Sequence, residues 1–143
     1  MEPGRGQAGL AMIRDSLRPA EHQVGAILVV EDEPLVRLTA AEELREAGMR
    51  VIEASDADEA MELLLAGASV DLVFADVVLP GSMDGLELAR RLRTDFPDIK
   101  ILMTSGRTPA HEAAELSPFI PKPYDIAEVI GRIRAACDEC APE

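Results

Sequence analysis

The sequence is poor in aromatic residues, in basic residues and in long apolar runs, and each shortage excludes a class of protein. It contains no Trp, three Phe and one Tyr, so aliphatic side chains must fill the core. Its 14 Lys and Arg face 27 Asp and Glu, and this net charge of -13 argues against binding to nucleic acid or anionic lipid, which attract clustered cations. No run approaches the roughly 18 apolar residues of a membrane span, and no secretory segment opens the chain. We therefore expect a cytoplasmic protein.

Cysteine is also scarce. The only two, Cys137 and Cys140, stand close together near the end of the chain. A zinc site needs about four ligands, and the two histidines, His22 and His111, are far away in the sequence. A redox Cys-x-x-Cys pair belongs at the start of a helix after a strand, whereas this pair falls at the end of the last expected helix. We interpret both cysteines as reduced thiols without a metal or redox role.

The first 25 residues are rich in Gly and Pro and are expected to form a flexible N-terminal extension. Within them Leu10, Ile13 and Leu17 recur at helical spacing. The alternative is therefore a short amphipathic helix over about 9–17 that docks on another surface or dimerises.

Residues 26–137 are expected to form one domain, with 138–143 as a C-terminal tail. Apolar strands are expected at 26–30, 49–54, 70–75, 99–104 and 119–120. Helical patterns follow them, starting at Pro34, after a capping box of Ser55 and Asp58, at Leu86, at Thr108 (a short one, to Leu116) and after Asp125. This alternation predicts a doubly wound α/β fold of the flavodoxin-like type, with a five-stranded parallel sheet covered by helices on both faces. With right-handed crossovers and the order 2-1-3-4-5, the first and third strands lie side by side.

Three acids follow those two neighbouring strands. The third strand runs into Asp76, and the first is followed by Glu31 and Asp32. Carboxylates brought together repel one another, and a divalent cation removes the conflict. Hard oxygen ligands with room for water and a substrate phosphate describe Mg²⁺ rather than zinc. The adjacent Glu33 is expected to be an ordinary solvated acid.

The fourth and fifth strands bring a hydroxyl and an ammonium to the same edge. Ser105 closes the fourth strand, and Lys122 follows the fifth between two prolines. Each alone would be an ordinary turn or surface residue. Around a nucleophilic carboxylate and a metal, however, these groups make a site for a phosphoryl group.

Four segments carry a resemblance to a known family, the receiver domain of two-component response regulators. The resemblance covers about residues 26–136, and its segments are Ile27–Glu33, Asp76–Gly85, Thr104–Gly106 and Phe119–Pro123. It implies that Asp76 accepts a phosphoryl group from the phosphohistidine of a sensor kinase. It further implies that Glu31 and Asp32 hold Mg²⁺ together with Asp76 and the backbone carbonyl of Val78.

The same resemblance assigns roles beyond the metal. Ser105 and Lys122 contact the phosphoryl oxygens, and Phe119 is the aromatic switch whose rotamer follows Ser105. Both Thr104 and Ser105 could supply the hydroxyl; Ser105 is chosen because the small residue Gly106 follows it, as the family pattern expects.

The chain departs from the family pattern in three further places. Glu31 stands where Asp is commoner, so it could ligate through water. The loop after Pro80 is one residue longer than usual, which bears on access to Asp76. The segment between Gly106 and Phe119 is short, so a reduced fourth helix is expected.

The expected function is that of a switch rather than an enzyme. A stand-alone receiver, without an output domain, takes its phosphoryl group from a sensor histidine kinase or a phosphotransfer protein. It signals by contact with an unknown downstream protein, and phosphorylation-dependent homodimerisation is left open. The alternatives are a receiver fragment of a hybrid kinase, a pseudo-receiver that binds without phosphorylation, and a phosphohydrolase. The hydrolase would carry an acid two residues after Asp76, where Val78 stands.

Overall fold

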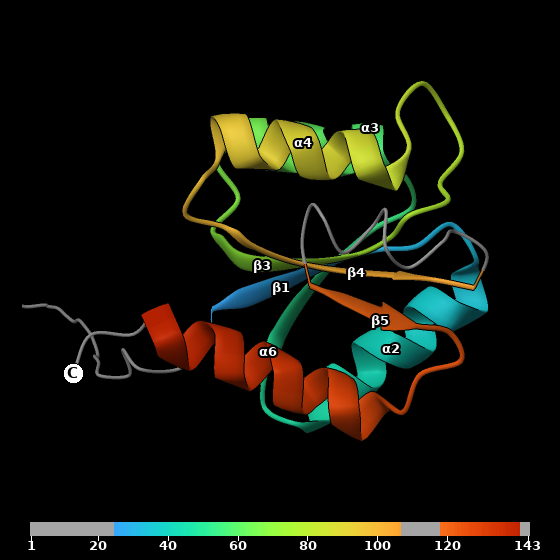
Figure 1. Ribbon diagram of the computed structural model, residues 1–143, viewed down its shortest axis with the longest axis vertical. Helices are drawn as coiled ribbons and strands as arrows, with labels where there is room; N and C mark the ends of the chain where they lie inside the picture. The colour runs from blue at the N-terminus through green and yellow to red at the C-terminus, as the bar shows by residue number, and fades with distance from the viewer. Residues whose placement is uncertain (1–24, 107–117, 141–143) are drawn as a thin grey trace, which may run out of the picture.

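The computed structural model describes residues 25–106 and 118–140 (Figure 1). The helices expected over 9–17 and 108–116 lie outside the described residues. None of the helices within the described ranges has the length and apolar character that a membrane span requires.

Five parallel strands form a single sheet in the order β2-β1-β3-β4-β5. Their bounds are β1 Ala26–Val30, β2 Arg50–Ala54, β3 Val70–Asp76, β4 Lys100–Ser105 and β5 Phe119–Pro121. The predicted fold class and strand order are therefore confirmed. The first two strands end where predicted, and the other three end one residue later, so that Asp76 and Ser105 are themselves the last residues of β3 and β4.

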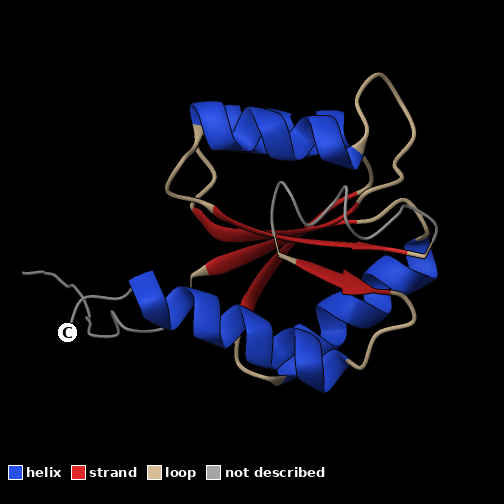
Figure 2. Ribbon diagram, viewed as in Figure 1, coloured by secondary structure: helices blue, strands red, loops and turns tan. Residues whose placement is uncertain are grey.

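Helices cover both faces of this sheet (Figure 2). They are α2 Pro34–Glu46, α3 Ala57–Leu65, α4 Gly85–Asp95 and α6 Ile126–Cys140. In both views α3 and α4 lie above the sheet and α2 and α6 below it. Because α6 continues through Cys140, Cys137 and Cys140 lie at the end of the last helix, as expected, and the start of the predicted tail is helical.

The core has two apolar layers, one on each face of the sheet. Successive residues of β1 face opposite layers, with Leu28 and Val30 on the side of α3 and α4, and Ile27 and Val29 on the side of α2 and α6. All of these side chains are buried. A strand that is apolar on both faces is typical of a parallel sheet sandwiched between helices, which explains why the sequence shows continuous apolar runs.

The predicted cap of α3 is wrong by one residue. Asp56, not Ser55, is the N-cap, and its side chain accepts a hydrogen bond from the amide of Glu59 at 2.8 Å. The Glu59 carboxylate reaches back and accepts hydrogen bonds from the amide and hydroxyl of Ser55, at 2.8 and 2.9 Å. Both Ser and Asp are good N-caps, and the longer Glu59 side chain, rather than Asp58, closes the box.

Candidate functional site

The predicted site residues lie at the carboxyl ends of the central strands, where β1 and β3 are neighbours. A cavity of about 540 Å³ opens there, and we call it the acidic cavity. Its walls include Glu31, Asp32, Asp76, Val78, Ser105 and Lys122. Open α/β sheets bind their ligands at this position, where the strand order reverses.

Lys122 joins two acids from different strands. Its Nζ atom donates a hydrogen bond to Asp76 Oδ2 at 2.7 Å and to Glu31 Oε1 at 2.9 Å. Burial alone would lower the pKa of Lys122, but the hydrogen bonds to Asp76 and Glu31 outweigh it and raise the pKa above its usual 10.5. The ammonium therefore stays charged and offsets the repulsion between the two buried carboxylates.

Glu31 is held at four atoms. Its amide donates to the carbonyl of Ala54 at 3.1 Å, and its Oε2 atom accepts from the amide of Glu33 at 3.2 Å. Its carbonyl accepts from Arg37 Nη1 at 2.8 Å. Burial raises the pKa of the Glu31 carboxyl, against the opposing hydrogen bond from Lys122. Both carboxylate oxygens already accept hydrogen bonds, which is compatible with ligation of a metal through water.

Backbone contacts fix Asp76 at the end of β3. Its Oδ1 atom accepts a hydrogen bond from the amide of Val78 at 2.9 Å. The carbonyl of Val77 accepts from the amide of Gly85 at 2.8 Å, which brings the start of α4 against the strand end. A Cβ atom at position 85 would overlap the Asp76 carbonyl oxygen and the Val77 Cα atom. Only glycine allows the two backbone segments to come this close, so the start of α4 packs directly against the backbone of Asp76.

The oxygen atoms on the wall of the acidic cavity are of the kind that binds Mg²⁺ in proteins. The carboxylates of Glu31, Asp32 and Asp76 are hard oxygen donors on the wall of one cavity, and Val78 lies beside them. Asp32 is exposed at the rim, whereas Glu31 and Asp76 are buried and contact Lys122. Within residues 25–106 and 118–140, no three Asp, Glu, His or Cys side chains gather as a metal shell. The shared magnesium ligation stays a prediction.

The structure distinguishes the two candidate hydroxyls by position. Ser105 lies on the wall of the acidic cavity, and its carbonyl accepts a hydrogen bond from the amide of Lys122 at 3.1 Å. Thr104 is one residue earlier on β4 and is not part of that wall. Its hydroxyl oxygen is buried and has no hydrogen-bond partner in the described part of the chain. This placement favours Ser105 as the hydroxyl that faces a phosphoryl group.

Phe119 lies at the start of β5 and outside the acidic cavity. It pairs with Met103 of β4, is half-buried and packs against the core layer of α3 and α4. Arg132 of α6 donates a hydrogen bond from Nη2 to the Phe119 carbonyl at 3.2 Å. In the strand register Phe119 lies one residue before the pair of Thr104 and Ile120, and its role as a switch stays a prediction.

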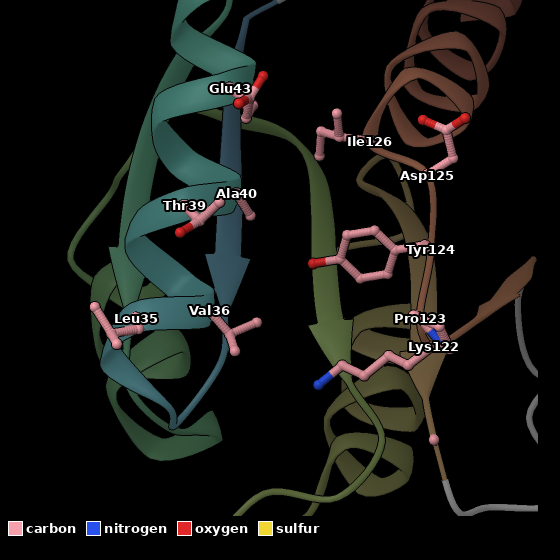
Figure 3. A pocket seen from close by; sticks show the side chains of 11 residues that line it. Leu35, Val36, Thr39, Ala40, Glu43, Lys122, Pro123, Tyr124, Asp125 and Ile126 are labelled. Atoms are coloured by element: carbon pink, nitrogen blue, oxygen red, sulfur yellow. The ribbon is translucent and has the colours of Figure 1, made fainter.

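Next to the acidic cavity is a second cavity, of about 840 Å³, that the sequence did not indicate (Figure 3). It lies between α2 and the segment that joins β5 to α6, and we call it the apolar groove. Leu35 and Tyr124 are on opposite walls, and Val36, Gly106 and Lys122 are shared with the acidic cavity. Leu35 is 77% exposed. The only signal in the sequence was a leucine directly after Pro34, outside the apolar stripe of its helix.

Comparison with known proteins identifies the family of the chain. The chain matches the family described as the response regulator receiver domain over residues 27–134. It is 37% identical over 114 residues to the sensor kinase CckA of Brucella abortus, a match that covers 76% of this chain and 12% of that protein. It is 34% identical over 122 residues to the response regulator MprA of Mycobacterium sp. strain KMS, covering 82% of this chain and 52% of that protein. The chain therefore spans about half or less of the length of these relatives.

A solved structure with the same fold is that of the response regulator TrrA of Thermotoga maritima in complex with Mg(2+)-BeF. The TM-score is 0.70 and the identity 29%, and the alignment covers 78% of this chain and 98% of the other. The fold thus recurs in a protein that was crystallised in complex with Mg(2+)-BeF.

Proposed function

Because the chain belongs to the response regulator receiver domain family of two-component signalling, we propose that it is a phosphoacceptor switch whose acceptor is Asp76. The observation that carries this proposal is the contact of Lys122 Nζ with both Asp76 and Glu31. A buried carboxylate that ends a central strand, beside a fixed ammonium and a second acid, suits attack on phosphorus.

In the proposed reaction a carboxylate oxygen of Asp76 attacks the phosphorus of a phosphohistidine on a sensor histidine kinase or a phosphotransfer protein. The new O–P bond forms as the P–N bond breaks, and the departing imidazole takes a proton from solvent. Lys122 offsets the charge on the transferred phosphoryl oxygens, since it already lies 2.7 Å from Asp76. Glu31, Asp32, Asp76 and the Val78 carbonyl would hold Mg²⁺, which when bound would further neutralise the phosphoryl oxygens.

The proposed switch follows from the added charge. An aspartyl phosphate adds about -1.5 to -2 charges at the end of β3. Ser105 lies on the wall of the same cavity as Asp76, and in the proposed switch its hydroxyl donates a hydrogen bond to the phosphoryl group. A shift of Ser105 would displace β5, because Ser105 pairs with Pro121 in the strand that begins at Phe119. Such a movement would shift the equilibrium between two conformations of this segment, and a downstream protein would bind one of them in preference to the other.

The apolar groove is the proposed contact surface for the protein that donates the phosphoryl group. It adjoins the acidic cavity through Val36 and Lys122 and presents an exposed Leu35. An exposed apolar wall next to a reactive carboxylate suits the apolar face of a partner helix that brings its phosphohistidine to Asp76. We propose no activity towards free phosphoesters, because Val78 occupies the place where a hydrolase of this kind needs an acid.

The test is phosphorylation by a small donor. The protein is incubated with Mg²⁺ and acetyl phosphate, and its intact mass is measured. We expect one added phosphoryl group in the wild type, none in Asp76→Asn, and none when EDTA removes the metal. Asp98→Asn, at an exposed acid outside the site, is the matched control and should be phosphorylated normally. An adduct that survives Asp76→Asn, or no adduct with any donor including a histidine kinase, would contradict the proposal.

A further inference from the structure

Behind the acidic cavity is a line of charged side chains that the sequence did not single out. Arg37 of α2 donates from Nη1 to the carbonyl of Glu31 at 2.8 Å. Its Nε atom contacts Glu53 Oε1 of β2 at 3.3 Å, and Arg45 holds the other oxygen of Glu53 at 3.3 Å. The Arg37 side chain is 20% exposed and that of Glu53 27%, so this pair is largely screened from water.

These contacts determine how the chain leaves β1. The carbonyl of Glu31 belongs to the peptide group that leads into Asp32, and it accepts the hydrogen bond from Arg37. The amide of Glu31 is fixed to β2 through Ala54. Both backbone groups of Glu31 are thus held, and Arg37, which Glu53 of β2 contacts in turn, restrains the peptide group from which Asp32 extends. Asp32 is exposed and is a wall residue of the acidic cavity.

We propose that Arg37 is a positioning residue for the magnesium ion, and that it acts by holding the Glu31–Asp32 peptide so that the Asp32 carboxylate faces the acidic cavity. Glu53 in turn holds the guanidinium in place. This inference rests on the proposed function, because it assumes that the acidic cavity binds Mg²⁺. It concerns the chain's own residues and does not require phosphorylation.

Whether removal of Arg37 weakens or tightens Mg²⁺ binding distinguishes a positioning role from a purely electrostatic one. A positive charge near a cation site weakens cation binding, so removal of Arg37 would tighten Mg²⁺ binding if its charge were all that mattered. Removal of a hydrogen-bond donor that orients a ligand weakens binding instead. Lysine keeps the charge but cannot span a carbonyl and a carboxylate with a planar fork. Arg37→Ala and Arg37→Lys should therefore both weaken binding.

The experiment is a titration of the protein with Mg²⁺ alone. Binding is measured by calorimetry and by the change in the NMR chemical shift of the Asp32 amide. We expect the Kd to rise on the order of tenfold in Arg37→Ala and Arg37→Lys, and to rise less in Glu53→Gln. Arg91→Ala is the matched control, because Arg91 pairs with Glu87 on the exposed surface of α4, and its Kd should equal that of the wild type. With acetyl phosphate, the slow reaction of Arg37→Ala at low Mg²⁺ should return to the wild-type rate at saturating Mg²⁺.

Several results would overturn the inference. An unchanged or lower Kd in Arg37→Ala would do so, as would a wild-type Kd in Arg37→Lys, or a rate that stays low at saturating Mg²⁺. If Arg37→Ala does not fold in EDTA, Arg37→Lys and Glu53→Gln decide the question by the same criterion. A wild-type protein that binds no Mg²⁺ would instead contradict the magnesium part of the proposed function, and the inference with it.

Discussion

At the scale of single residues, the site depends on backbone contacts so close that no side chain larger than that of glycine fits at position 85. Gly85 is the first residue of α4, and its amide donates a hydrogen bond to the carbonyl of Val77, next to Asp76, the proposed acceptor. The position of Asp76 is therefore set by the backbone of α4 as well as by Lys122. A side chain at position 85 would meet the backbone of Asp76 and Val77.

Gly85→Ala should destabilise the protein and displace Asp76. The added Cβ would overlap backbone atoms of Asp76 and Val77, and overpacking of this kind costs about 1–3 kcal/mol. Urea unfolding measures the loss, and acetyl phosphate measures reactivity of the folded fraction. Gly131→Ala is the control, because a Cβ there meets nothing within 4 Å in the middle of α6 and should stabilise the protein by up to about 1 kcal/mol. Equal stability of the two variants would refute this account.

At the scale of elements, α3 begins with contacts that the sequence indicates only approximately. Ser55, Asp56 and Asp58 are all suitable as caps by residue type, and only the coordinates show that Asp56 is the N-cap and Glu59 its partner. The carboxylate of Glu59 accepts two hydrogen bonds from Ser55, and these lower the pKa of Glu59 below its usual 4.5. The ionised form is thus favoured by folding.

Glu59→Gln should lower the stability at neutral pH by about 0.5 kcal/mol, because the side chain is exposed and its charge is screened. A lowered pKa in the folded state stabilises the protein above pH 4.5, and the contribution is lost as the pH falls through the folded pKa. The difference between wild type and variant should therefore shrink as the pH falls below 4.5. Thermal unfolding across pH 3 to 7 measures it. Ser55→Ala should reproduce part of the loss at pH 7, and a difference that does not vary with pH would rule out the charge as its cause.

At the scale of the whole molecule, the fold could be predicted because it depends on local patterns. Apolar strands such as β1 and their alternation with helices determine the layers, and the crossover rule then brings Glu31 and Asp76 to one edge. The pairing of Arg37 with Glu53 and the apolar groove could not be predicted. Both depend on contacts between side chains of different elements, namely α2, β2 and the β5–α6 segment. The spacing of residues within a single element does not show which side chains of another element they will contact.

The exposed leucines provide a test of the proposed partner surface. Leu35→Glu should slow phosphotransfer from a phosphohistidine protein by about tenfold, since a charge would replace an apolar contact at the interface. Phosphorylation by acetyl phosphate should not change, because that donor needs no protein contact. Leu65→Glu is the control, since Leu65 is 72% exposed on α3, on the other side of the sheet. Equal effects of the two substitutions on phosphotransfer would show that the groove is not the contact surface.

The position of Lys122 in the chain has a consequence for synthesis. Its partners Glu31 and Asp76 precede it by 91 and 46 residues, so a nascent chain that has emerged only as far as β4 contains both acids without the ammonium that offsets their repulsion. The contacts among Glu31, Asp76 and Lys122 can form only after β5 and Lys122 have left the ribosome. A chain cut short before Lys122 would therefore lack the charge pairing of the proposed acceptor site.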